Sequence, residues 1–161
     1  MVKRMKLHLL RHAKTDQSSP TGRDFDRKLL PRGIAQCADL RNTLPSELQM
    51  VEVWCSSSAR TRATYALISE GGKLKEATFS DALYLASRSE LFQAITAHNG
   101  DQDLLIIGHN FGISDLAAYL IDEHVELQTG GYICISFDIS SWKELSHGLG
   151  TTVLSYRPEV R

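Results

Sequence analysis

Short apolar runs recur along the chain and predict the strands of a sheet. One run, residues 7–10, stops abruptly at Arg11 and His12, and the fully apolar run Leu104–Ile107 stops at Gly108-His109-Asn110. Apolar runs that end in polar residues are typical of strands buried on both faces. We expect further strands at Met50–Cys55, Ala77–Phe79, Tyr132–Phe137 and Thr151–Tyr156, the last two as a hairpin-like pair at one end of the sheet.

Segments with helical spacing of apolar residues separate these strands. Two of them begin at serines that can cap a helix, and Glu90 completes a capping box with Ser87. A polar loop, Asp16–Lys28, follows the first strand and is long enough to fold over a site at the strand end. We expect helices from Pro31 to Pro45, from Ser58 to Gly71-Gly72, from Ser87 to Asn99-Gly100, and from about Gly112 to Leu120.

This alternation of strands and helices predicts an α/β fold, a three-layer α/β/α sandwich with a mainly parallel central sheet. A length of 161 residues suits a single domain that spans residues 1–161. Parallel strands end at the same edge of a sheet, where open α/β sheets bind their ligands. His12, Arg60 and His109 each follow a predicted parallel strand, so we expect them to lie at one edge.

Composition restricts where such a site can bind. The net charge is -1, which argues against broad electrostatic binding to nucleic acid or to a membrane, so an anion site must be local. The basic start Met1–Lys6 precedes an apolar run too short for a signal peptide, and no stretch approaches the roughly 18 apolar residues of a membrane span. We therefore expect a cytoplasmic protein, with its cysteines as reduced core thiols: Cys37, Cys55 and Cys134.

Two histidines and two arginines at strand ends favour phosphoryl transfer. Guanidinium groups match the oxygens of a phosphate and stabilise the charge that develops on them. A neutral imidazole can attack phosphorus to give a covalent phosphohistidine that water removes. Arg11 and His12 alone are equally compatible with an edge strand carrying a surface Arg-His pair.

Several motifs in order make the chain resemble the histidine phosphatase superfamily, which is phosphoglycerate mutase-like in fold, and within it the small SixA-type phosphohistidine phosphatases. They are Arg11-His12-Ala13, Asp24-Phe25-Asp26-Arg27 with Leu29, Arg32-Gly33, Ser56 with Arg60, and Gly108-His109-Asn110.

The resemblance implies a role for each residue of the site. It makes His12 the phosphorylated nucleophile, Arg11 and Arg60 the phosphate clamp, and His109 a second phosphate ligand. The glycine that usually follows the nucleophile is Ala13 in this chain, a change between small residues that we expect to be tolerated.

The carboxylic acid by which many superfamily members protonate a leaving oxygen has no distinctive counterpart. Only Asp81 stands in the corresponding region, where its Ser-Asp context also suits a loop or capping residue. An alkoxide needs that proton, whereas the conjugate acid of imidazole has a pKa of about 6.5, so imidazole leaves with little help. A weak general acid therefore favours a substrate with a P–N bond.

We accordingly expect a metal-independent phosphatase that acts on phosphohistidine in a protein, through a phosphohistidine intermediate on His12. No long insertion builds a lid, which favours a protein substrate such as a phosphotransfer domain or phosphocarrier of signal transduction. One alternative is a phosphomonoesterase for small molecules with Asp81 as the general acid. Another is an interaction module that binds phosphate without turnover.

Other residues suggest chemistry that we weigh less. Cys55 and Arg60 do not have the five-residue spacing of a cysteine phosphatase loop, so Cys55 is expected in the core. His8 is expected to be structural, and the arginines beside His12 and His109 favour an anion over a metal, so no metal or cofactor is predicted. Lys14 either contacts the substrate or remains a solvated surface charge.

Overall fold

The computed structural model describes residues 4–159, so the first residues of the basic start lie outside it. In this part of the chain six strands form one sheet in the order β3-β2-β4-β1-β5-β6. The first four in that order are mutually parallel, and β5 is antiparallel to both β1 and β6. The mainly parallel sheet with a terminal antiparallel pair is therefore confirmed. The strands are β1 (Arg4–Arg11), β2 (Glu52–Ser56), β3 (Ala77–Ser80), β4 (Leu104–Gly108), β5 (Tyr132–Asp138) and β6 (Thr151–Tyr156).

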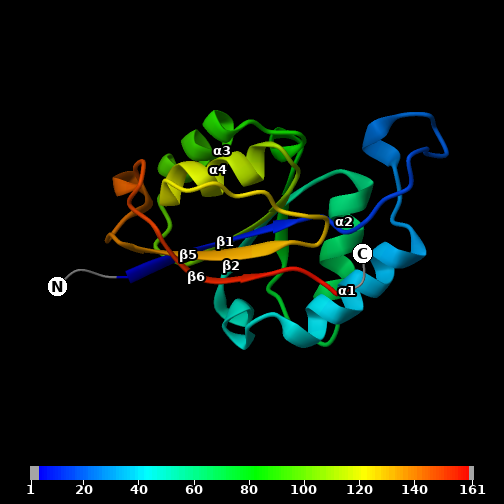
Figure 1. Ribbon diagram of the computed structural model, residues 1–161, viewed down its shortest axis with the longest axis horizontal. Helices are drawn as coiled ribbons and strands as arrows, with labels where there is room; N and C mark the ends of the chain where they lie inside the picture. The colour runs from blue at the N-terminus through cyan, green and yellow to red at the C-terminus, as the bar shows by residue number, and fades with distance from the viewer. Residues whose placement is uncertain (1–3, 160–161) are drawn as a thin grey trace.

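Helices cover both faces of this sheet, which confirms the three-layer sandwich. One pair packs together on one face and the other pair on the opposite face (Figure 1). The first pair is α1 (Pro31–Thr43) and α2 (Ala59–Ile68), and the second is α3 (Arg88–Thr96) and α4 (Gly112–Ile121). No helix among the described residues has the length and apolar character that crossing a bilayer requires.

Some predicted boundaries are wrong by a few residues. The helix α2 ends at Ile68, before Gly71 and Gly72, because both glycines have positive φ and belong to the turn that follows. The strand expected from Met50 begins at Glu52 instead. Short 3₁₀ helices that the apolar pattern does not reveal are η1 (Asp24–Asp26), η2 (Ser46–Met50), η3 (Asp81–Leu83) and η4 (Trp142–Glu144).

The central strand β4 shows why its run is apolar at every position. Leu104 and Ile106 pack into the cluster beneath α3 and α4, whereas Leu105 and Ile107 pack into the cluster beneath α1 and α2. Successive side chains of a strand point to opposite faces, and both faces are covered here. The three cysteines are free and buried, as expected, and they belong to the α1/α2 cluster.

The strand register brings the carboxyl ends of the parallel strands to one edge. Arg11 pairs with Gly108 at the ends of β1 and β4, and Ser56 pairs with Ser80 at the ends of β2 and β3. The polar loop between β1 and α1 projects from this end of the molecule (Figure 1). The residues that follow the strands therefore meet the loop at a common site.

Candidate active site

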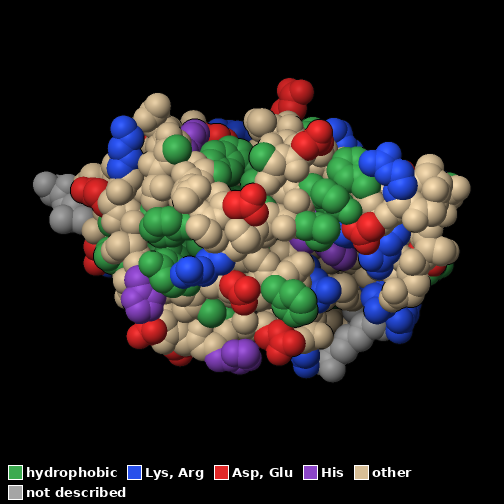
Figure 2. Space-filling model, turned by 90° about the horizontal axis from the view of Figure 1, so that it is seen from above, with side chains coloured by type: hydrophobic (Ala, Val, Ile, Leu, Met, Phe, Trp, Pro, Cys, Tyr) green, Lys and Arg blue, Asp and Glu red, His purple; other side chains and the backbone are tan. Residues whose placement is uncertain are grey.

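A cavity of about 290 Å³ opens at this edge of the sheet. It brings together His12, Arg60 and His109, as the strand order predicts, and Arg11 and Lys14 line it as well. Figure 2 shows the hollow, with histidine side chains visible inside it. The remaining lining residues come from the loop after β1 and from three other segments: Thr15, Gln17, Asp24, Arg27, Leu85, Asn110 and Thr129.

His12 is held in one tautomer by its own backbone neighbour. Its Nδ1 lies 2.8 Å from the carbonyl oxygen of Ala13, and a carbonyl only accepts, so Nδ1 carries the proton and donates it. The other ring nitrogen, Nε2, therefore holds a lone pair. Burial, the largest cause, and the nearby charges of Arg60 and Arg11 lower the pKa of His12 to about 3. The imidazole is thus neutral at physiological pH, which is the state a nucleophile requires.

The second histidine, His109, faces His12 with their ring centroids 5.4 Å apart. Its Nε2 lies 2.8 Å from the hydroxyl oxygen of Ser56, and its Nδ1 is buried without a partner. Burial, followed by the charge of Arg60, lowers the pKa of His109 to about 3. When the Ser56 hydroxyl donates to Nε2, the proton resides on Nδ1, which then serves as a donor to a bound anion.

The two arginines carry donors that no protein group uses. Arg11 donates from Nη1 to the carbonyl of Leu127 at 3.0 Å, but its Nε has no partner, nor has the Nε of Arg60. Burial, followed by the charge of Arg60, lowers the pKa of Arg11. Among the described residues, three of the four buried side-chain nitrogens without a partner belong to residues that line this cavity, and the fourth belongs to His8. Buried polar atoms are normally hydrogen-bonded, so their convergence indicates a ligand site.

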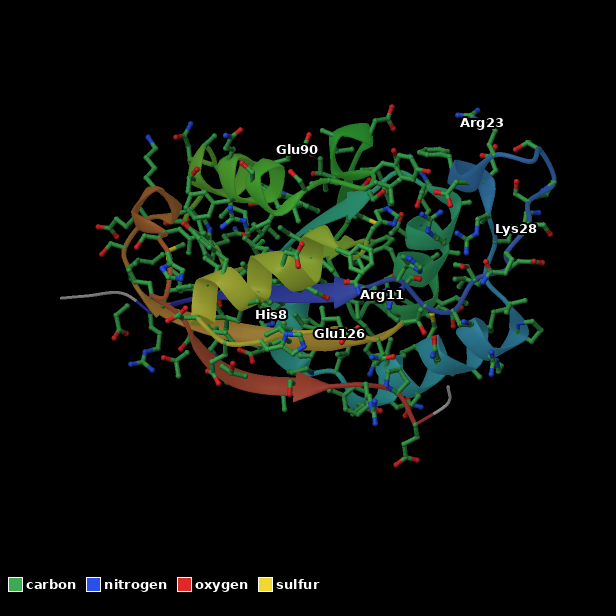
Figure 3. The ribbon with its side chains drawn as sticks, turned by 45° about the horizontal axis from the view of Figure 1, so that its top comes forward. His8, Arg11, Arg23, Lys28, Glu90 and Glu126 are labelled. Atoms are coloured by element: carbon green, nitrogen blue, oxygen red, sulfur yellow. The ribbon has the colours of Figure 1, made fainter. Side chains whose placement is uncertain are left out.

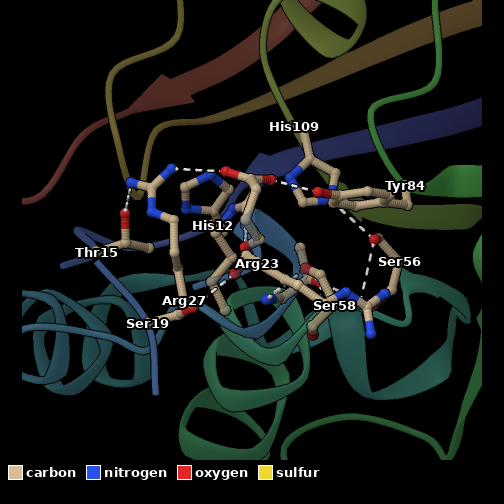
Figure 4. A network of polar contacts seen from close by, with 12 residues as sticks. His12, Thr15, Ser19, Arg23, Arg27, Ser56, Ser58, Tyr84 and His109 are labelled. Atoms are coloured by element: carbon tan, nitrogen blue, oxygen red, sulfur yellow. Dashed lines mark hydrogen bonds and ion pairs between the residues drawn. The ribbon is translucent and has the colours of Figure 1, made fainter. Parts of the chain in front are cut away.

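Asp24 holds the outer side of the cavity and had no site role in the sequence prediction. Its carboxylate accepts from Arg60 Nη2 at 2.9 Å, from Arg27 Nη1 at 2.9 Å and from the hydroxyl of Tyr84 (Figure 4). Arg27 also donates to the Thr15 hydroxyl at 2.6 Å, which ties the loop to the end of β1. The Tyr84 hydroxyl, followed by the two arginines, holds the pKa of Asp24 well below its usual range. The signal available in the sequence was the position of Asp24 in a motif of the loop expected to cover the site.

Asp81, the proposed general acid and substrate-binding residue, is not brought into the cavity. It is exposed at the start of η3, and its carboxylate accepts a hydrogen bond from Ser57. Leu85, two residues beyond the 3₁₀ helix that begins at Asp81, lines the cavity instead. In this structure Asp24 is the carboxylate that lines the site among the described residues, and a role for Asp81 stays a prediction.

The structure also places the residues that suggested other chemistry. Cys55 is fully buried, and burial raises the pKa of its thiol to about 12, which does not suit a thiolate nucleophile. His8 is buried and its Nδ1 lies 2.6 Å from the Tyr132 hydroxyl, away from the cavity-lining residues. Within residues 4–159 no three His, Cys, Asp or Glu side chains are grouped as metal ligands.

Comparisons with known proteins agree on the family. The sequence pattern of the histidine phosphatase superfamily (branch 1) matches residues 7–84. No significant sequence match is found among curated proteins. A structure from Nakamurella multipartitia, described as a proposed phosphohistidine phosphatase SixA, is 25% identical, covers 98% of each chain and has a TM-score of 0.79.

Two further SixA structures share the fold. The proposed phosphohistidine phosphatase SixA from Agrobacterium tumefaciens is 21% identical with a TM-score of 0.79, over 96% of this chain and 98% of that one. The protein histidine phosphatase SixA complexed with tungstate is 20% identical with a TM-score of 0.77, over 96% and 97%. The match over residues 7–84 and the fold shared along nearly the whole chain make this protein similar to members of the histidine phosphatase superfamily.

Proposed function

We propose that the protein is a metal-independent phosphatase that hydrolyses phosphohistidine on another protein, with His12 as the nucleophile. The observation that carries the proposal is the pairing of a free imidazole lone pair with unpartnered N–H groups in one cavity. His12 Nε2 supplies the lone pair, and Arg11 and Arg60 supply the donors. The superfamily match and the SixA-like fold support a phosphatase.

The reaction proceeds in two steps. The lone pair of His12 Nε2 forms a bond to phosphorus while the P–N bond of the substrate breaks, and its electron pair leaves with the substrate imidazole, which takes a proton from solvent. Water then attacks the phosphorus of phospho-His12, the enzyme P–N bond breaks, and its electron pair returns to His12 Nε2. The products are inorganic phosphate and neutral His12, and the proton lost by water goes to solvent. Throughout, Arg11, Arg60 and His109 hold the phosphoryl oxygens.

The P–N specificity rests on the lack of a proton donor for an alkoxide. Asp24, the carboxylate that lines the cavity among the described residues, is ionised because Tyr84, Arg27 and Arg60 donate to it. An ionised carboxylate cannot protonate a leaving oxygen, whereas a leaving imidazole with a conjugate acid of pKa about 6.5 needs little help.

The experiment compares two substrates in the presence of a chelator: a protein phosphorylated on histidine, and an alkyl phosphate, whose alkoxide leaving group needs a proton. We expect much faster turnover of the first. His12→Ala is expected to lose turnover by several orders of magnitude, and the control His124→Ala, an exposed histidine outside the cavity, to retain it. Turnover retained by His12→Ala, or lost with the chelator, would contradict the mechanism.

Two other functions give different results in the same assay. Faster turnover of the ester, with a loss on Asp81→Asn, would favour a phosphomonoesterase for small molecules. Its support is weaker because Asp81 lies outside the cavity. Failure to form a phosphoenzyme from either substrate would favour an interaction module that binds phosphate, although such a module has no need for a neutral, free Nε2 on His12.

A further inference from the structure

Two large apolar side chains stand exposed beside the mouth of the cavity. Leu85 lines the cavity and is 53% exposed, and Phe111, which follows the lining residues His109 and Asn110, is 78% exposed. We call Leu85 and Phe111 the apolar rim. Single exposed apolar residues are common, so exposure alone does not make this pair a functional surface. The backbone and the position of the pair supply the further evidence.

Leu85 is held outward at the cost of backbone strain. Its φ is 51°, a left-handed conformation that bulky side chains rarely adopt because Cβ crowds the following carbonyl. Leu83 and Ala86 on either side are buried, so they anchor the turn and leave Leu85 directed to solvent. A strained residue persists when the surrounding structure over-determines it, and such residues cluster at functional sites.

Phe111 belongs to the same rim because the two loops that carry the pair touch. A Cβ on Gly112 would lie 1.8 Å from the carbonyl oxygen of Ala86, so Gly112 permits the loop before α4 to pack directly on the loop before α3. Phe111 and Leu85 adjoin this contact in the sequence, so the two exposed side chains lie on adjoining loops. In Figure 2 hydrophobic side chains gather on one side of the hollow that contains the histidines.

The loop after β1 forms another side of the mouth and carries basic residues together with Asp16, Asp24 and Asp26. Lys14 and Arg27 line the cavity there, and Arg23 and Lys28 are exposed on the same loop. Figure 3 shows Arg23 and Lys28 at the end of the molecule where β1 terminates at Arg11. A partner that contacts both sides would carry an apolar patch on one side of its phosphoryl group and acidic side chains on the other.

We propose that the apolar rim docks a folded protein whose surface presents the phosphorylated histidine between an apolar patch and acidic residues. The inference rests on the proposed function, which it extends from the chemistry to the mode of recognition. A small phosphorylated molecule fits within a cavity of about 290 Å³, so the outward faces of Leu85 and Phe111 contact only a ligand that extends beyond the mouth. A few well-packed residues near the centre of an interface carry most of its binding energy.

The test compares variants on two substrates: an acidic histidine phosphotransfer domain phosphorylated on its histidine, and phosphoimidazole. The variants are Leu85→Asn, Phe111→Ala and the double variant, and the matched control is Met50→Ala. Met50 is 72% exposed but precedes β2, at the opposite edge of the sheet. We expect the double variant to raise KM for the protein substrate about tenfold. Phe111→Ala, at a residue outside the cavity lining, is expected to raise that KM while it changes kcat/KM for phosphoimidazole less than about twofold. Met50→Ala is expected to alter neither.

Thermal unfolding distinguishes a docking role of Leu85 from a purely structural one. If Leu85 were purely structural, replacing it would lower Tm. Asn tolerates the left-handed conformation at position 85, so Leu85→Asn is expected to keep or raise Tm while KM for the protein rises. A lowered Tm with unchanged KM would overturn the proposal, and so would an equal loss on both substrates, since that would place Leu85 in the chemistry instead of in docking.

The wild-type protein separates failure of this inference from failure of the proposed function. If the wild-type protein acts on the phosphoprotein and the rim variants do so equally well, the docking surface alone is overturned. Wild-type activity on phosphoimidazole without activity on the phosphoprotein overturns the docking surface and the protein substrate but retains the P–N chemistry. Inactivity on both overturns the proposed function itself.

Discussion

Asp24 accepts a hydrogen bond from Nη2 of Arg60 at 2.9 Å, while Nε of the same guanidinium is buried without a partner. The backbone carbonyl of Asp24 also accepts from Arg60 Nη1 at 2.8 Å. The two Nη atoms of Arg60 are thus held by Asp24, and its Nε remains without a partner. A phosphate that binds Arg60 shares that guanidinium with Asp24 or displaces its carboxylate.

Replacing Asp24 with Asn is expected to tighten phosphate binding several-fold, because the change removes the anion that competes for Arg60 and adds one positive charge to the cavity. The measurement is inhibition by inorganic phosphate, or its binding by calorimetry. Asp26→Asn is the control, since it removes a carboxylate from the same turn but not from the cavity. Weaker binding by Asp24→Asn would mean that Asp24 serves chiefly to orient Arg60.

Removing the Ser56 hydroxyl is expected to lower kcat/KM about tenfold, the effect of losing one hydrogen bond that sets the tautomer of a ligand imidazole. The matched control is Ser57→Ala, because Ser57 bonds to Asp81 outside the cavity and should be nearly neutral. NMR of the His109 ring nitrogens reports the tautomer directly. Equal losses of kcat/KM in the two variants would contradict a specific role for the Ser56 hydroxyl. They would favour a role for Asp81, the partner of Ser57.

Acid is expected to destabilise the fold partly through His8. Burial lowers its pKa to about 4 in the folded protein, against about 6.5 in an unfolded chain. Between these values the unfolded chain binds a proton that the folded protein does not, so stability falls as the pH drops from 6.5 towards 4. At pH 5 the loss from His8 is about 2 kcal/mol.

His8→Gln should therefore show a smaller drop in the free energy of unfolding between pH 7.5 and pH 5, because an amide does not titrate there. Urea unfolding at the two pH values measures this difference. The lowered pKa values of His12 and His109 act in the same direction, so some acid sensitivity should persist. An identical drop in both proteins would show that His8 is accessible to protons in the folded state.

Gly33→Ala is expected to destabilise the protein although it lies in a helix, where alanine normally gains about 1 kcal/mol over glycine. A Cβ at this position would lie 2.1 Å from the carbonyl oxygen of Lys14, an atom that accepts from the Leu30 amide at 3.0 Å. Urea unfolding gives the sign of the change. We also expect lower activity, because the displaced segment carries Lys14 next to His12, and a stabilised variant would contradict the close approach.

The apolar pattern was sufficient to predict the layers of the fold. Runs such as Leu104–Ile107 are buried on both faces, so their composition reports a covered parallel strand directly. Boundaries were less predictable, because local turn geometry decides them. The glycines after α2 adopt positive φ several residues beyond the last helical residue. The apolar pattern does not predict how many residues separate the end of the helix from these glycines.

The sequence by itself determined which residues meet at the candidate site. Parallel strands end at one edge of the sheet, so the residues that follow them had to converge. These residues are His12, Arg60 and His109. Only the tertiary structure decided which carboxylate joins them. Asp24 and Asp81 each begin a short 3₁₀ helix in a connecting segment, and no periodicity fixes where such a side chain points. Contacts far apart in sequence fix it instead: Tyr84 and Arg60 draw Asp24 into the cavity, and Ser57 keeps Asp81 outside it.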